Sequence, residues 1–196
     1  MCSYVNEMLK DNYIRVPYCK SIHGEEEVEA VIKCLSESTQ MGKYARNFEK
    51  EIAKLFSKKE SIFLNSGSSA LTLAMNVLNL KKNDEVITPA LNFGTAISSI
   101  VLAGAKPVFV DVNIETLQID VKKIKAKISK NTKVLLIPNL IGNIPDWKQI
   151  KKIARQNKLK IIEDSADTLG AKINNISTGN YSDISITSFY GSHIIS

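Results

Sequence analysis

The chain has 196 residues, of which 44% are hydrophobic and 23% are charged, so it is long enough to build a substantial hydrophobic core. Its formal net charge of +6 comes from lysines spread in pairs along the whole length, without a basic tract or interleaved aromatic residues. This pattern argues against a nucleic-acid partner. The most hydrophobic stretch, residues 96–105, is about half as long as a membrane-spanning helix needs to be, which argues against a membrane protein.

The cysteines and the N-terminal residues indicate that the protein is located in the reducing cytoplasm. Cys2, Cys19 and Cys34 show neither paired spacing nor the spacing of metal ligands, so we expect no disulfide framework and no metal site. The first residues contain no apolar signal segment. The sequence therefore predicts a soluble cytoplasmic protein.

Apolar spacing predicts the secondary structure in chain order. Residues 1–23 show no periodicity, and two amphipathic helices follow, one from Glu25 and one carrying Tyr44 to Phe56. Beyond them, apolar runs alternate with helical patterns. The expected strands are 61–64, 85–88, 108–112, 134–137, 161–164 and 184–189, with helices around 71–78, 96–103, 121–128 and 147–154. Strands that are apolar throughout and alternate with helices indicate the α/β class, a mostly parallel sheet covered by helices.

The segment Asn65-Ser-Gly-Ser-Ser69 lies between an expected strand and an expected helix. Gly67 lets the backbone approach a ligand closely, the helix N-terminus offers unpaired N–H groups, and Ser68 adds a hydroxyl. The segment could therefore bind a phosphate, or it could be an ordinary Ser/Gly turn that caps the helix. It matches neither the Walker loop nor the dinucleotide fingerprint.

Three further side chains follow the ends of expected strands, where open α/β sheets carry their chemistry. Asp164 would be buried there and would need a cationic or donor partner: a protonated pyridine nitrogen, a lysine or a helix N-cap. Asp167 could share that site or cap the segment. Phe93 could stack on a flat ring or fill the core.

The last stretch, Ser188-Phe-Tyr-Gly-Ser-His193, lies just past the apolar run from Ile184 to Thr187, at the end of an expected strand. His193 is one of only two histidines in the chain. It could be a packed, hydrogen-bonded core residue, or a group that moves protons near neutral pH.

In its order of motifs, the chain resembles the pyridoxal-phosphate enzymes of the DegT/DnrJ/EryC1/StrS sugar aminotransferase family. The resemblance extends from Val16-Pro17 through residues 65–70, 84–89 and 104–111 to residues 162–164 and 188–189. It implies an aspartate-aminotransferase-like fold of type I. Residues 1–43 would form an N-terminal arm and first helix, and residues 44–196 the cofactor-binding large domain, with the C-terminal small domain absent.

The resemblance also implies a role for each motif. Gly67 and Ser68 would hold the phosphate of pyridoxal or pyridoxamine 5'-phosphate, and Phe93 would stack on the pyridine ring. Asp164 would pair with the ring nitrogen and keep it protonated, which makes the ring an electron sink.

Further site residues follow from the same resemblance. Ser188 would add a hydroxyl to the phosphate, and Asp167 would belong to the cofactor site. The substrate sugar would lie near a segment formed by Thr39, Gln40, Met41 and Gly42.

One departure from the family pattern concerns His193, which stands where the aminotransferases have a lysine. Imidazole has no primary amine and cannot form the internal Schiff base. The substitution is similar to the branch of nucleotide-linked 4-keto-6-deoxy-hexose 3-dehydratases, which implies that His193 is a general acid–base.

The implied function of the full-length enzyme is removal of the C3 hydroxyl in deoxysugar biosynthesis, for surface polysaccharide or lipopolysaccharide. The expected partners are a nucleotide-linked keto-sugar, an amino donor such as glutamate, and a second copy in a homodimer. Two alternatives remain: a nucleotide-sugar aminotransferase of the same fold, and an inactive truncated homologue or binding module.

Overall fold

The computed structural model describes residues 22–37, 39–191 and 193, so most of the expected N-terminal arm lies outside it. The α-helices are α2 (Glu25–Glu37), α3 (Lys43–Leu55), α4 (Gly67–Asn76), α5 (Gly94–Leu102), α6 (Val121–Lys127) and α7 (Trp147–Asn157). The strands are β1 (Glu85–Pro89), β2 (Lys106–Val110), β3 (Thr132–Pro138), β4 (Lys160–Ser165), β5 (Lys172–Ile173), β6 (Ile176–Ser177) and β7 (Ile184–Thr187). Two 3₁₀ turns are η1 (Leu140–Gly142) and η2 (Thr178–Tyr181).

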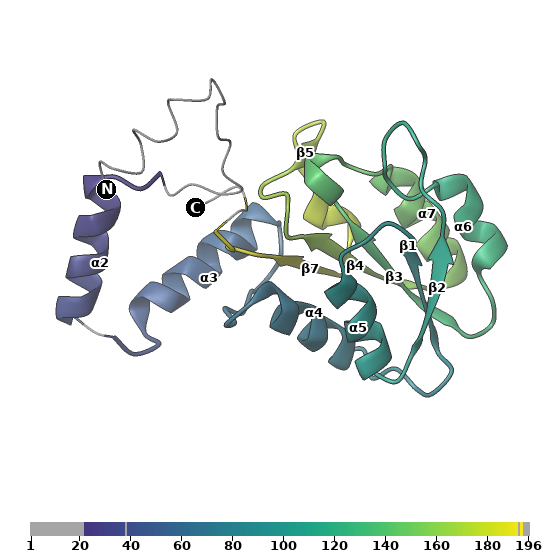
Figure 1. Ribbon diagram of the computed structural model, residues 1–196, viewed down its shortest axis with the longest axis horizontal. Helices are drawn as coiled ribbons and strands as arrows, with labels where there is room; N and C mark the ends of the chain where they lie inside the picture. Colours follow the sequence, from purple (N-terminus) through teal and green to yellow (C-terminus); the bar gives the residue numbers. More distant parts are fainter. Residues whose placement is uncertain (1–21, 38, 192, 194–196) are drawn as a thin grey trace, which may run out of the picture.

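A five-stranded sheet forms the centre of the molecule, in the order β2-β1-β3-β4-β7 (Figure 1). Every neighbouring pair in it is parallel. Helices α4 and α5 cover one face, and α6 and α7 cover the other (Figure 1). The α/β class expected from the apolar strands is therefore confirmed.

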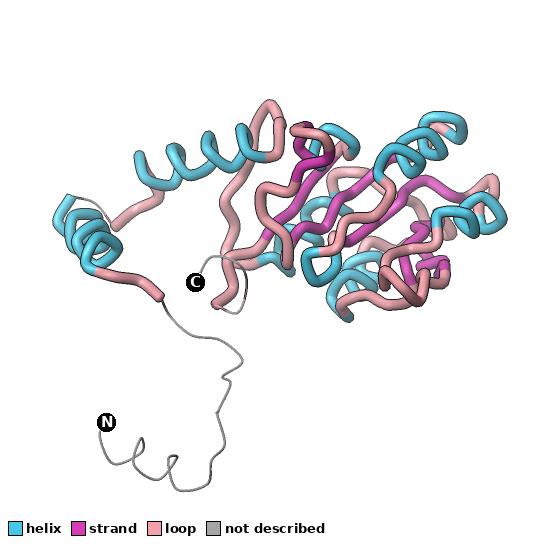
Figure 2. Tube along the Cα trace, turned by 90° about the horizontal axis from the view of Figure 1, so that it is seen from above, coloured by secondary structure: helices cyan, strands magenta, loops and turns pink. Residues whose placement is uncertain are grey.

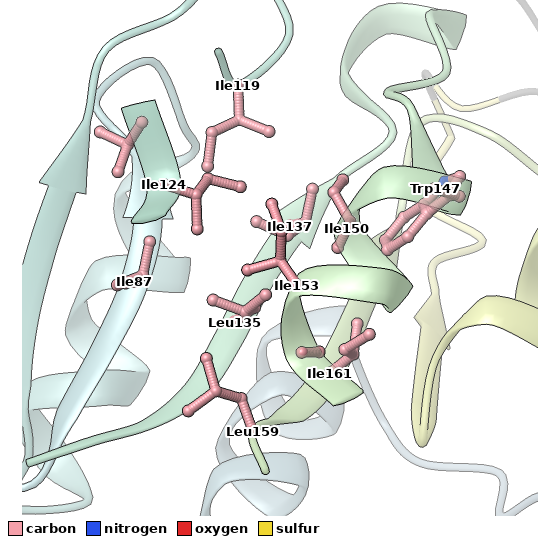
Figure 3. Packing of buried hydrophobic residues seen from close by; sticks show 12 residues of the cluster. Ile87, Ile119, Ile124, Leu135, Ile137, Trp147, Ile150, Ile153, Leu159 and Ile161 are labelled. Atoms are coloured by element: carbon pink, nitrogen blue, oxygen red, sulfur yellow. The ribbon is translucent and has the colours of Figure 1, made fainter. Parts of the chain in front are cut away.

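Two hydrophobic clusters, one on each face of the sheet, explain why the strands are apolar throughout. Along β3, Leu135 and Ile137 face α6 and α7, whereas Val134 and Leu136 face α4 and α5. Figure 3 shows the first cluster, which contains the fully buried Trp147 of α7 together with isoleucines from the sheet, from α6 and from α7. Each such side chain contributes roughly 1.5–3 kcal/mol when removed from water.

The strand expected at residues 61–64 is absent, so this prediction is wrong. The segment follows α3 and is hydrogen-bonded to that helix: the Phe63 N–H donates to Glu49 Oε1 at 2.9 Å, and the Ser61 side-chain hydroxyl donates to the Glu49 carbonyl at 2.6 Å. Among the described residues no strand pairs with it, and Ile62 is 70% exposed. A segment forms a β-strand only where a neighbouring strand can hydrogen-bond to its backbone, and apolar composition alone does not provide that neighbour.

Two smaller differences have local causes. The strand expected at residues 108–112 is β2, which begins two residues earlier and includes Pro107. Proline is tolerated there because β2 lies at the edge of the sheet. The short antiparallel pair β5–β6 was not expected, since Asn174 and Asn175 at its tip adopt positive φ angles that the apolar pattern does not reveal.

Helices α2 and α3 extend away from the sheet, with α2 at the far end (Figures 1 and 2). Helix α2 has no buried residue, although its apolar side chains have helical spacing. Helix α3 is anchored at its C-terminal end, where Phe56 is 3% exposed and the Ser177 hydroxyl donates to the Leu55 carbonyl at 3.0 Å. The expected boundary between residues 43 and 44, which would separate the N-terminal arm and first helix from the large domain, stays a prediction.

No helix in the part of the chain that the structure describes is long and apolar enough to cross a bilayer.

Candidate active site

A large open pocket begins at the carboxyl ends of β1, β3 and β4 and continues along β7 to α3. Its volume of about 1490 Å³ exceeds the roughly 300–1,000 Å³ of a typical small-molecule site, so more than one small molecule fits. Seven of the residues predicted from the sequence line it together: Gly67, Ser68, Phe93, Asp164, Asp167, Ser188 and His193. The parallel sheet explains this convergence, because the carboxyl ends of its strands share one edge.

The predicted phosphate-binding segment forms the N-terminus of α4. Ser66 is the N-cap, and its hydroxyl accepts from the Ser69 N–H at 3.1 Å. The helix-capping interpretation is therefore correct. It is compatible with anion binding, since Gly67 and Ser68 occupy the first turn, where N–H groups have no partner within the helix. Ser188 adjoins this turn, because a Cβ on Gly67 would lie 3.2 Å from its hydroxyl oxygen.

Asp164 ends up buried on β4, with 5% of its surface exposed. Its Oδ1 accepts one hydrogen bond, from the Ala166 N–H at 3.1 Å. Burial raises the pKa of this carboxyl to about 6, although the Ala166 N–H opposes the rise. Within residues 22–37, 39–191 and 193, no lysine or arginine forms an ion pair with it. Asp164 is therefore a buried acid without a lysine or arginine partner among the described residues, although the charge of His193 acts on it and lowers its pKa.

Phe93 stands at the N-cap of α5 and is 68% exposed, so it does not fill the core. The preceding turn is fixed by Asn92, which donates to Thr88 Oγ1 at 2.9 Å and accepts from the Phe93 N–H at 2.8 Å. The ring is therefore left uncovered beside the pocket, where a flat ligand could stack on it.

His193 lies beside Asp167, with Nε2 of the imidazole 3.6 Å from Oδ1 of the carboxylate. Its backbone N–H donates to the Tyr190 carbonyl at 2.7 Å, and the two rings meet edge to face at 5.7 Å. The other oxygen of Asp167 accepts from the Ile141 N–H at 3.3 Å. The His193 side chain lines the pocket and is 19% exposed, so it is not fully enclosed in the core.

Lysines are absent from the carboxyl-end edge of this pocket, as far as the described residues show. Lys58 is the lysine in the lining, and it lies near residues 179–182, beyond the amino end of β7. Its Nζ donates to the Gly179 and Ser182 carbonyls, each at 2.7 Å, and burial lowers its pKa. Lys172 is exposed on β5 and does not line the pocket.

A buried polar network next to the pocket was missed at the sequence level. The fully buried Glu163 accepts from Asn139 and Ser165 on one oxygen and from Ser182 and Ser185 on the other, over 2.6–3.1 Å. Asn139 follows the end of β3 and accepts from the Trp147 indole at 2.8 Å. The position of Asn139 after the end of a strand is the sequence signal from which its role in this network could have been predicted.

The segment predicted to lie near the sugar does not reach this pocket. Thr39, Gln40, Met41 and Gly42 form the bend between α2 and α3 and do not contribute to the lining. Their role in substrate binding stays a prediction.

Comparison with known proteins identifies the family. Residues 21–196 match the model of the DegT/DnrJ/EryC1/StrS aminotransferase family, and the chain belongs to this family. It is 33% identical to the GDP-4-keto-6-deoxy-D-mannose 3-dehydratase of Escherichia coli O55:H7 over 92% of this chain and 49% of that protein. It is 34% identical to the GDP-perosamine synthase of Vibrio cholerae over 79% of this chain and 42% of that protein.

Solved structures agree with the fold. The E. coli GDP-4-keto-6-deoxy-D-mannose-3-dehydratase with bound hydrated pyridoxal phosphate superposes with a TM-score of 0.78 and 32% identity, over 84% of this chain and 44% of that one. The fold-type-I architecture expected from the resemblance is therefore confirmed. The chain spans about half the length of the curated relatives it matches.

Proposed function

We propose that the whole protein is a dehydratase that removes the C3 hydroxyl of a nucleotide-linked 4-keto-6-deoxy-hexose, with pyridoxal or pyridoxamine 5'-phosphate as cofactor. The observation that carries the proposal is His193, which lines the pocket while no described lysine reaches the same edge. The similarity to a GDP-4-keto-6-deoxy-D-mannose 3-dehydratase supports the substrate class. The proposed biological role is deoxysugar synthesis for surface polysaccharide.

The pocket residues fit the cofactor. The first turn of α4 and the Ser188 hydroxyl suit a phosphate, and the uncovered ring of Phe93 suits a pyridine. Asp164, buried and without a lysine or arginine partner among the described residues, would gain a cationic partner from a protonated ring nitrogen, which would also favour its ionised form. When bound, the cofactor supplies an electron sink that stabilises negative charge on an adjacent carbon.

Residues of the chain would bind the cofactor and transfer protons. Asp164 would keep the ring nitrogen protonated by offering a carboxylate in a site of low solvent exposure. His193 takes up and returns a proton at an imidazole nitrogen, which is general acid–base catalysis. Gly67, Ser68 and Ser188 would hold the phosphate of the cofactor.

The second candidate function is a nucleotide-sugar aminotransferase, which the 34% identity to a GDP-perosamine synthase favours. It would require a lysine amine at the pocket edge, where this chain has His193. A homodimer, glutamate as the amino donor and a cytoplasmic location stay part of the proposal for the whole protein.

The experiment compares the wild-type protein with His193→Lys after loading with pyridoxal phosphate, followed by borohydride reduction and mass spectrometry. The dehydratase proposal expects no covalent label on the wild type and a label on residue 193 in the variant, which the added lysine makes possible. The glutamate-loaded wild type should then convert a 4-keto-6-deoxy nucleotide sugar to a product that has lost one oxygen. An amino sugar as product, or a borohydride label on the wild type, would instead establish the aminotransferase.

A further inference from the structure

Asn139, the first residue after β3, connects that strand to the end of β4. In the register of the two strands Pro138 is the partner of Asp164, and the next N–H along β3, that of Asn139, donates to the Asp164 carbonyl at 2.8 Å. The Asn139 carbonyl accepts from the Thr168 hydroxyl, also at 2.8 Å. The backbone of one residue therefore holds both ends of residues 164–168, the turn segment, which contributes two carboxylates to the pocket lining.

The side chain of Asn139 fixes the position of that backbone. Its Nδ2 donates to Glu163 Oε1 at 3.0 Å and to the Ser165 hydroxyl at 2.8 Å, and its Oδ1 accepts from the Trp147 indole at 2.8 Å. These partners also fix the orientation of the amide, because exchanging its oxygen and nitrogen would place the NH₂ group against the indole donor. Asn139 is 1% exposed, so the hydrogen bonds are shielded from water.

The two neighbours of Asp164 on β4 thus share one partner. Successive side chains of a strand point to opposite faces, so Glu163 and Ser165 bind Asn139 on one face while Asp164 points to the other. The Asp164 carboxylate itself accepts one hydrogen bond within the described chain, from the Ala166 N–H inside the turn segment. The direction of this carboxylate therefore depends on the conformation of the turn segment.

The pKa of Asp164 reports on that conformation. Burial is the largest cause of its rise to about 6, and the charges of Asp167 in the turn segment and Glu163 on β4 raise it further. The Ala166 N–H and the charge of His193, after β7, lower it. A turn segment that opened would admit water to the carboxylate and so weaken the largest of these contributions.

We infer that Asn139 is a positioning residue, which holds the turn segment in place and so directs the Asp164 carboxylate into the pocket. The effect on the turn segment concerns the chain alone. Its consequence for the cofactor rests on the proposed function, in which Asp164 binds the ring nitrogen. Asn139 acts through Asp164, and the inference requires no contact between Asn139 and the cofactor.

The first test follows the titration of Asp164 in the cofactor-free protein by ¹³C nuclear magnetic resonance of labelled aspartates, with the signal assigned by its loss in Asp164→Asn. The wild-type midpoint should lie at about 6. Asn139→Ala should move it toward the ordinary value of 3.8, because the loosened turn segment lets water reach the carboxylate. Thr168→Val, a milder variant that removes one hydrogen bond and nearly preserves the side-chain volume, should move it less in the same direction.

Two controls separate positioning from general stability. Asn143→Ala removes an exposed asparagine that donates to the Thr116 carbonyl at 3.0 Å and does not line the pocket. Ile150→Val lowers stability within a hydrophobic cluster that excludes the turn segment. Both should leave the Asp164 midpoint unchanged. Equal midpoints in wild type, Asn139→Ala and Thr168→Val would overturn the inference, and so would an equal shift in Ile150→Val.

The second test loads the full-length protein with ¹⁵N-labelled pyridoxal phosphate, whose signal shows whether the ring nitrogen carries a proton. Asn139→Ala should raise the Kd of the cofactor about fivefold, the factor that corresponds to roughly one hydrogen bond, and should lower the protonated fraction of the ring nitrogen. Equal protonation in wild type and Asn139→Ala would overturn the consequence for the cofactor. A shifted Asp164 midpoint in a protein whose wild type binds no cofactor would count against the proposed function and leave the positioning role of Asn139 standing.

Discussion

Gly67 and Ser188 approach each other so closely that a Cβ on Gly67 would lie 3.0 Å from the Cβ of Ser188. One residue begins α4 and the other follows β7, so this contact joins the two halves of the proposed phosphate site. The absence of a side chain at residue 67 therefore has a specific structural reason.

Gly67→Ala should weaken cofactor binding, because the methyl group would displace Ser188 from the helix N-terminus. We expect the Kd for pyridoxal phosphate to rise about tenfold, which corresponds to about 1.4 kcal/mol. Fluorescence titration of the protein with the cofactor would measure it. Gly94→Ala is the matched control: Gly94 also opens a helix, and no atom lies within 4 Å of the point that an added methyl group would occupy. Equal affinities in the two variants would contradict the prediction.

Asp164→Asn should stabilise the cofactor-free chain at neutral pH. The pKa of Asp164 is raised to about 6 in the folded state, so ionisation disfavours folding, with the full cost present above that pH. The cost, at most about 3 kcal/mol, shrinks as the pH falls through 6 and disappears below the ordinary value of 3.8. Urea denaturation of wild type and variant at a pH above 6 and at a pH near 4 would measure it. A stability difference that does not depend on pH would exclude this explanation.

Glu163→Ala should destabilise the chain by about 3–5 kcal/mol, because two buried donors, on Asn139 and Ser165, and two partly buried serine hydroxyls would lose an acceptor. Glu163→Gln should cost less, since the amide oxygen still accepts and the serine hydroxyls can rotate. Chemical denaturation provides the measurement. The exposed Glu115→Ala is the control and should change stability by less than about 0.5 kcal/mol. A small loss in Glu163→Ala would show that the network is not a stabilising unit.

Phe93→Ala should separate binding from folding. With 68% of its surface exposed, Phe93 contributes little to the core, so the free energy of unfolding should change by less than about 0.5 kcal/mol. Cofactor affinity should fall several-fold, because stacking on the ring is lost. Phe109→Ala on the edge strand β2 is the control, since Phe109 is 46% exposed and does not line the pocket. A fall in stability without a fall in affinity would contradict the stacking role.

The sequence by itself determined the class of fold and the location of its chemistry. Apolar runs such as those of β3 and β4 are local patterns, and burial of both strand faces follows from them directly. Residues at or just after strand ends, such as Asp164 and Phe93, could be found in the same way. In a parallel sheet these ends necessarily meet at one edge.

Other features were decided only by the tertiary structure, because they depend on which distant segments meet. Residues 61–64 have the composition of a strand, yet the described chain gives them no pairing partner, and Glu49 binds the Phe63 N–H and the Ser61 hydroxyl instead. The sequence left the partner of Asp167 open, and the fold brings its carboxylate to the imidazole of His193. The amino-acid type determines whether a side chain can be buried. Which groups pair with that side chain or orient it depends on contacts between distant segments, and these exist only in the folded structure.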